Sequence, residues 1–95
     1  MNTESCDMVM VSYEVADSYD MPPGGFCFRN NKEGQLVMWL CFPNGSTSVI
    51  KIRPYEGSDP SWEWDGNEDK PTLSPSVNAV GCWHGWVKSG RLVSC

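Results

Sequence analysis

The stretch from Phe26 to Pro54, FCFRNNKEGQLVMWLCFPNGSTSVIKIRP, decides the fold class. Two apolar runs, FCF and QLVMWLCF, flank the polar turn RNNKEG, and the pair Asn44-Gly45 supplies a second turn before TSVIKIRP alternates apolar and polar residues. Apolar runs joined by such turns are typical of β-hairpins, and Asn-Gly tolerates the positive φ angles of a tight turn. The stretch therefore predicts three consecutive antiparallel strands between residues 26 and 53.

The C-terminal part of the chain carries the same signal. Residues 83–95, WHGWVKSGRLVSC, predict a hairpin that turns at Ser89-Gly90. The preceding run PTLSPSVNAV contains two prolines, which bar a regular helix and keep the neighbouring residues extended. We therefore expect strands near 72–80 and 84–94 that close the first three strands into one core.

The N-terminal region has the weakest pattern. Thr3 could cap a helix, but MVMVSYEV, residues 8–15, is rich in β-branched and aromatic residues and favours a strand. Seven prolines and nine glycines leave few windows for three helical turns elsewhere. The fold expected for residues 1–95 is mainly β: a small, single-domain antiparallel sandwich or partly open barrel.

The charge and the apolar pattern exclude several classes of protein. The formal net charge of −5 argues against direct binding to nucleic acid, which needs clustered Lys and Arg. No apolar run approaches the roughly 20 residues of a membrane helix, and the start MNTESCDMVM lacks the features of a signal peptide. Five cysteines, an odd number, argue against a disulfide framework. We therefore expect a cytoplasmic protein whose cysteines are thiols or metal ligands.

The only histidine, His84, lies in the run GCWHGW, two residues after Cys82. Side chains at i and i+2 of a strand point to the same face, so this pair could supply two ligands of a zinc ion. The same pair could act as a thiol nucleophile and its base, although a small β domain offers little cleft for a substrate. A third interpretation has His84 capping a turn while the cysteines pack in the core. The residues alone leave these alternatives open.

An acidic segment, EGSDPSWEWDGNED, spans residues 56–69 and carries six negative charges with no positive charge among them. Such a charge density contributes nothing evident to a core, so we expect the segment to face outward and to meet a basic surface of a partner protein. Trp62 and Trp64 lie on one side of an extended piece within it, and we expect Trp64 to be a core residue. The predicted partner-binding residues are Glu56, Asp59, Glu63, Asp65, Glu68 and Asp69.

Four fragments, PPGGFCF, CFPNGS, WEWDGNEDKPTLSPSV and GCWHGWVKSGRL, lie between residues 22 and 92. Together they resemble a family of small tailed-phage and prophage proteins of unknown function that often carry the misleading name "ammonia monooxygenase". The runs WEWDG and PTLSPS are the most specific part of the resemblance, and residues 1–21 lie outside it.

The resemblance implies a metal site. A cysteine before a Pro-Asn-Gly turn and a later Cys/His cluster look like zinc ligands in that pattern, which implies Cys41, Cys82 and His84, with Cys95 as a fourth candidate. The chain departs from the pattern at residues 46–48, where Ser-Thr-Ser stands in place of a further cysteine. The resemblance therefore implies either zinc or no cofactor.

The resemblance also implies a phage origin, and small acidic phage proteins without an enzyme signature are often inhibitors. The expected function is non-enzymatic: binding to a basic surface of a host protein, such as a CRISPR–Cas or other defence complex, and blocking it. The alternative is a small zinc-binding or thiol-dependent enzyme centred on Cys82 and His84.

Overall fold

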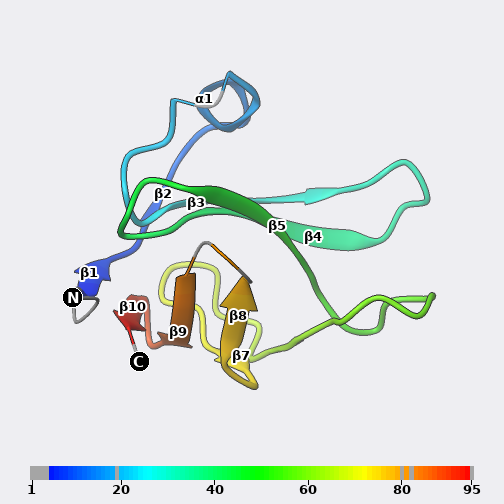
Figure 1. Ribbon diagram of the computed structural model, residues 1–95. Helices are drawn as coiled ribbons and strands as arrows, with labels where there is room; N and C mark the ends of the chain where they lie inside the picture. The colour runs from blue at the N-terminus through cyan, green and yellow to red at the C-terminus, as the bar shows by residue number, and fades with distance from the viewer. Residues whose placement is uncertain (1–4, 19, 80, 82, 95) are drawn as a thin grey trace.

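In the computed structural model, which describes residues 5–18, 20–79, 81 and 83–94, the chain folds into two four-stranded β-sheets and a two-stranded ladder (Figure 1). One sheet has the strand order β1-β10-β9-β8, the other has the order β2-β3-β4-β5, and the ladder pairs β6 with β7. No helix in these residues is long and apolar enough to cross a membrane. The strands are β1 (Ser5–Asp7), β2 (Val9–Met10), β3 (Gly25–Asn30), β4 (Leu36–Cys41), β5 (Thr47–Lys51), β6 (Glu63–Trp64), β7 (Leu73–Ser74), β8 (Val77–Ala79), β9 (Trp83–Lys88) and β10 (Arg91–Ser94), and the described helix is α1 (Tyr13–Asp17).

The three strands predicted between residues 26 and 53 are confirmed as β3, β4 and β5, which pair antiparallel in sequence order. The first turn is held by the Asn31 carboxamide, whose oxygen accepts hydrogen bonds from two backbone N–H groups of the loop. The second turn uses Gly45, which has a φ of 90°. The turn residues that favour a hairpin in the sequence therefore form the hairpins of the structure.

The two sheets face each other across one core, which makes the domain a β-sandwich, one of the two architectures expected from the sequence; its strands pair antiparallel except for β2, which pairs parallel with β3. Phe26, Met38 and Leu40 of one sheet and Val87 and Leu92 of the other lie in the same buried cluster. The sheets are bridged at one side by consecutive strands of the chain, because β1 pairs with β10 and β2 then pairs with β3. The described strands form no closed barrel.

The predicted closing hairpin is confirmed as β9 and β10. Its two-residue turn, Ser89-Gly90, has φ angles of 49° and 79°, as the hairpin turn with two positive φ angles requires. Trp83, at the start of β9, is buried and stacks on Phe42 with ring centroids 5.0 Å apart, and its indole N–H donates to Ser94 Oγ. The Trp83 indole therefore makes one of the contacts that join the closing hairpin to the other sheet.

Two expectations are met only in part. Within residues 8–15 the strand ends at Met10 and α1 begins at Tyr13, because the Ser12 hydroxyl caps the helix by accepting from the Val15 N–H. Trp64 packs against the core from its rim and is only half-buried; its ring centroid lies 4.4 Å from that of Phe28.

Gly85 lies against the indole of Trp83 on β9. A Cβ at this position would clash with the Trp83 ring and with the carbonyl oxygen of Val93. We expect Gly85→Ala to lower the free energy of unfolding by about 1–3 kcal/mol, as overpacking typically does. Urea unfolding, with Lys88→Ala at an exposed position of the same strand as the control, measures the effect. Equal midpoints for both variants would contradict the close packing of the indole.

Candidate functional site

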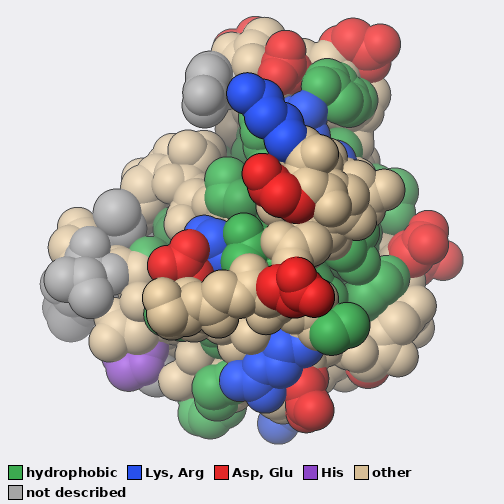
Figure 2. Space-filling view, turned by 90° about the vertical axis from the view of Figure 1, so that its right-hand side faces the viewer, with side chains coloured by type: hydrophobic (Ala, Val, Ile, Leu, Met, Phe, Trp, Pro, Cys, Tyr) green, Lys and Arg blue, Asp and Glu red, His purple; other side chains and the backbone are tan. Residues whose placement is uncertain are grey.

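His84, the only imidazole of the chain, lies on the outer face of the sheet that contains β9. Along β9 buried and exposed residues alternate, so that Trp83, Gly85 and Val87 face the core while His84 and Trp86 face outward. Figure 2 shows the histidine at the surface of the molecule. Its side chain is therefore accessible to a ligand or substrate.

The residue directly opposite His84 on β8 is Asn78, which is also exposed. Val77 pairs with Gly85, and Ser76 directly precedes Val77, one residue before β8 begins. The side chain of Ser76 is half-buried. Strand pairing thus brings the carboxamide of Asn78 and the imidazole of His84 to one exposed surface, with a serine two residues before Asn78.

The backbone of Ser76 is held in place by a hydrogen bond from Trp62. The indole N–H of Trp62 donates to the Ser76 carbonyl oxygen over 3.1 Å. Trp62 is itself tied to the end of β5, because its N–H donates to the Lys51 carbonyl and its carbonyl accepts from the Arg53 N–H. The backbone of Ser76 is therefore fixed through Trp62 to the end of β5, and its side chain is half-buried.

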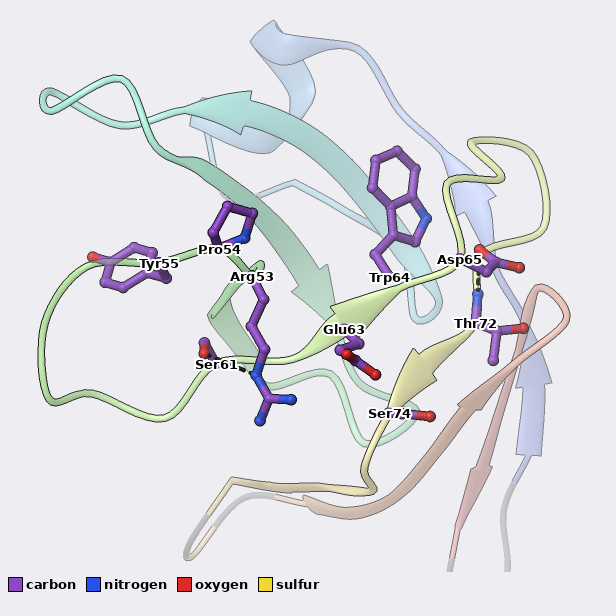
Figure 3. A pocket seen from close by; sticks show the side chains of 9 residues that line it. All are labelled: Arg53, Pro54, Tyr55, Ser61, Glu63, Trp64, Asp65, Thr72 and Ser74. Atoms are coloured by element: carbon purple, nitrogen blue, oxygen red, sulfur yellow. Dashed lines mark hydrogen bonds between the residues drawn. The ribbon is translucent and has the colours of Figure 1, made fainter.

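An open cleft of about 890 Å³ lies next to this segment (Figure 3). Its polar lining includes the guanidinium of Arg53, whose Nε donates to Ser61 Oγ over 3.2 Å, and the carboxylate of Glu63. Ser74 faces the cleft from β7, opposite Glu63 in the ladder. No imidazole lines the cleft among the described residues, so Ser74 lacks the base that Ser76 has nearby.

The six predicted partner-binding carboxylates are all exposed, as expected. Two of them have local roles: Asp65 Oδ1 accepts from the backbone N–H groups of Asn67 and Thr72, and Asp59 lies 3.9 Å from the Lys51 ammonium. Glu63 and Asp65 line the cleft, and Glu56, Glu68 and Asp69 lie outside it. Binding of a partner by this segment stays a prediction.

The structure does not bring Cys41 and His84 together. Cys41 is buried with Cys27 in a small cluster under α1, on the outer side of the sheet that does not contain His84. Cys82 and Cys95, the other two predicted ligands, lie outside the described residues. Within the described part of the chain no group of three or more His, Cys, Asp or Glu could hold a metal ion. The zinc site stays a prediction.

Burial, with a smaller contribution from nearby Cys6, raises the pKa of the Cys41 thiol above its ordinary value. A raised pKa keeps the thiol protonated, and the protonated form is a poor nucleophile. Among the described cysteines, Cys41 is thus a packing residue. Asn78 and the neighbouring Ser76 are not among the residues predicted from the sequence. No motif marks them, because only the register of β8 against β9 places Asn78 beside His84.

Comparison with known proteins identifies a family for the chain. A family model described as "bacterial ubiquitination-like system serine protease" (BubE) matches residues 12–95. No curated protein and no solved structure matches the chain. The match covers most of the chain, including Ser76, Asn78 and His84.

The match corrects three predictions. The expected function, a non-enzymatic phage inhibitor of a host defence complex such as CRISPR–Cas, is wrong, and so is the expectation that the protein is not an enzyme. The alternative, a zinc-binding or thiol-dependent enzyme centred on Cys82 and His84, is not matched either, because the family is one of serine proteases. The physical reason for the error is that neither the acidic charge nor the Cys82-x-His84 spacing carries any signal of a serine protease. The chain belongs to the bacterial ubiquitination-like system serine protease family.

Proposed function

We propose that the protein is a serine protease in which Ser76 is the nucleophile and His84 is the general base. The observation that carries the proposal is the pairing of β8 with β9, where the sole imidazole of a chain from a serine protease family lies opposite Asn78, two residues after Ser76. Serine proteases on unrelated folds share this pair of groups and are recognised by geometry rather than by sequence position.

The reaction assigns one step to each group. His84 accepts the proton of the Ser76 hydroxyl as Ser76 Oγ attacks the carbonyl carbon of the scissile peptide bond. The protonated imidazole then gives that proton to the leaving amine, and an acyl-enzyme remains on Ser76. Water, deprotonated by His84, hydrolyses the ester and restores the free hydroxyl. Atoms and charge balance without any further reactant.

Two neighbouring groups complete the proposed site. Asn78 lies directly opposite His84, where its carboxamide oxygen can accept from the imidazole N–H and orient the ring. The backbone N–H of Ser76 points to the same side as its carbonyl, away from β9, and can donate to the oxyanion of the tetrahedral intermediate. Asn78 is a positioning residue in this scheme, because it acts through the imidazole.

A cytoplasmic setting is part of the proposal. The thiols of Cys27 and Cys41 are not joined in disulfides, which is the usual state of cysteines in a reducing compartment. The description of the family points to a substrate within a ubiquitination-like system, and we propose that the substrate is a protein of such a system.

Labelling with a fluorophosphonate probe tests the assignment. Such probes form a stable adduct with an activated serine hydroxyl, so we expect peptide mapping by mass spectrometry to place one adduct on Ser76. Ser74→Ala should be labelled like the parent, whereas His84→Ala should be labelled at least about 100-fold more slowly, because general-base assistance contributes typically 10²–10⁴-fold. An adduct on a different serine would overturn the assignment of Ser76, and a protein that neither reacts nor cleaves any peptide would overturn the protease function.

A further inference from the structure

We propose that two adjoining hollows on the outer face of β3, β4 and β5, one cationic and one apolar, bind an acidic peptide segment of a partner protein. This face belongs to the sheet that does not contain His84, so the inference does not rest on the proposed function. Helix α1 covers one end of the face, at Cys27 and Cys41, and lies above this sheet in Figure 1. The two hollows lie on the part of the face beyond that cluster.

The cationic hollow has a volume of about 370 Å³, and its lining holds three of the seven lysines and arginines of the chain. Arg29 of β3 and Lys51 of β5 both pair with Val37 of β4, so the two cations lie on one face with this apolar residue between them. The third cation, Lys32, lies in the turn between β3 and β4. Among the described residues no Asp or Glu lines the hollow. In a chain of net charge −5, this local excess of positive charge indicates a site for an anionic group.

The guanidinium of Arg29 is fixed in position but is only partly neutralised. It lies between two aromatic rings, 4.0 Å from the centroid of Tyr13 and 4.2 Å from that of Trp39. Its Nη1 atom is buried and has no hydrogen-bond acceptor in the part of the chain that the structure describes, because Asp17 Oδ1 lies 3.7 Å away. The positive charge therefore stays available to a further anion in the hollow.

The ammonium of Lys51 is accessible to a ligand. Its Nζ lies 5.9 Å from the centroid of the Tyr55 ring, which also lines the cationic hollow. Asp59 Oδ2 lies 3.9 Å from the same Nζ, which is too far for a hydrogen bond, and the Asp59 side chain is 64% exposed. An exposed ion pair of this kind is weak, so a carboxylate of a partner can take the place of Asp59.

The apolar hollow has a volume of about 130 Å³, and its lining includes Met21, Trp39 and Val49. Trp39 and Val49 also line the cationic hollow, so the two hollows adjoin. Val49 is 44% exposed and is two residues from Lys51 on β5, about 7 Å along the strand. Alternate side chains of an extended peptide have the same spacing. A peptide with an acidic residue two positions from an apolar one therefore matches both hollows.

The charge of the whole molecule favours a peptide over a nucleic acid. A strand of nucleic acid carries a continuous run of phosphates, which would extend beyond the three cations and meet the negative charge of the rest of the chain. A short peptide with one or two carboxylates interacts mainly with the cationic hollow. The apolar hollow then adds affinity through an apolar side chain, which a phosphate backbone does not offer.

Selection from a displayed library of random peptides tests the inference. Peptides are selected on the parent protein and depleted on the double variant Lys32→Glu/Lys51→Glu, and we expect the enriched sequences to carry Asp or Glu two positions from an apolar residue. For the best peptide, labelled with fluorescein, fluorescence polarisation should give a Kd at least about tenfold higher for this variant than for the parent. The control Lys70→Glu/Lys88→Glu changes the net charge equally at exposed positions elsewhere, and its Kd should stay within about twofold of the parent value.

Equal losses in the two double variants, no enrichment, or enriched peptides without an acidic residue would overturn the proposal. So would tighter binding of a single-stranded oligouridylate than of the selected peptide, which would make the hollows a nucleic-acid site.

Asp59→Asn gives a test of opposite sign. Because this change removes the carboxylate that competes for Lys51, we expect the Kd of the selected peptide to fall about two- to fivefold. An unchanged or higher Kd would contradict the placement of the acidic side chain at Lys51. Thermal melting checks that each variant folds, and if Lys32→Glu/Lys51→Glu does not fold, the result for Asp59→Asn decides.

Discussion

Replacing Ser76 by alanine should lower kcat/KM for peptide cleavage by on the order of 10³-fold or more, because no covalent intermediate can form without the hydroxyl. His84→Ala should cost a similar factor, since the two groups act in one step, and the double variant should be little worse than either single variant. The initial rate of cleavage of a peptide substrate, measured for each of the three variants and for the parent, checks this prediction.

Ser74→Ala is the matched control, because Ser74 lies on the same short segment but has no imidazole nearby. Its rate should stay within a few fold of the parent, and all variants should melt at about the parent temperature, since Ser74 is exposed, Ser76 is only half-buried and each change removes a single hydroxyl. A large loss in Ser74→Ala with little change in Ser76→Ala would move the nucleophile into the cleft of Figure 3 and contradict the site proposed above.

Trp83→Ala should remove a large part of the stability of the protein. The side chain is 7% exposed, stacks on Phe42 and donates to Ser94, so its loss opens a cavity and removes a contact between the closing hairpin and the other sheet. Tryptophan-to-alanine changes in a core cost about 3–5 kcal/mol. Total stability near 0.05–0.15 kcal/mol per residue gives a chain of 95 residues only about 5–14 kcal/mol.

Trp86→Ala is the control for this prediction, because Trp86 lies on the same strand and is 47% exposed. Thermal melting followed by circular dichroism should show a cooperative transition for Trp86→Ala near that of the parent and a low or absent one for Trp83→Ala. Two variants of equal stability would contradict the alternation of buried and exposed residues along β9.

The sandwich could be predicted from the sequence because its signals are local. The alternation in residues 26–53 and the turn residues Asn44-Gly45 and Ser89-Gly90 specify strands and hairpins within a few residues of chain. The helix at Tyr13–Asp17 was not predicted, because one cap at Ser12 outweighs a run whose residues favour strands. The half-buried place of Trp64 depends on contacts with Phe28, which is far away in the sequence.

The candidate site could be predicted only in part. His84 stands out as the sole histidine, and the neighbouring Cys82 made a metal or thiol site the natural hypothesis. Its partners proposed here, Asn78 and Ser76, become visible only once the register of β8 against β9 is known, because nothing in the run PTLSPSVNAV marks one serine as different from the other. A residue pair made by strand register has no motif that a single sequence can show.

A protein with one histidine gives a single set of imidazole signals in its proton magnetic resonance spectrum. In nuclear magnetic resonance every histidine ring-proton signal of this chain comes from His84, on the face of β8 and β9. No resonance assignment is needed to know which residue gives these signals. Formation of an adduct on Ser76, binding of a peptide or replacement of Asn78 should each shift this one pair of resonances. Each of these events can therefore be followed in the unlabelled protein through the signals of His84.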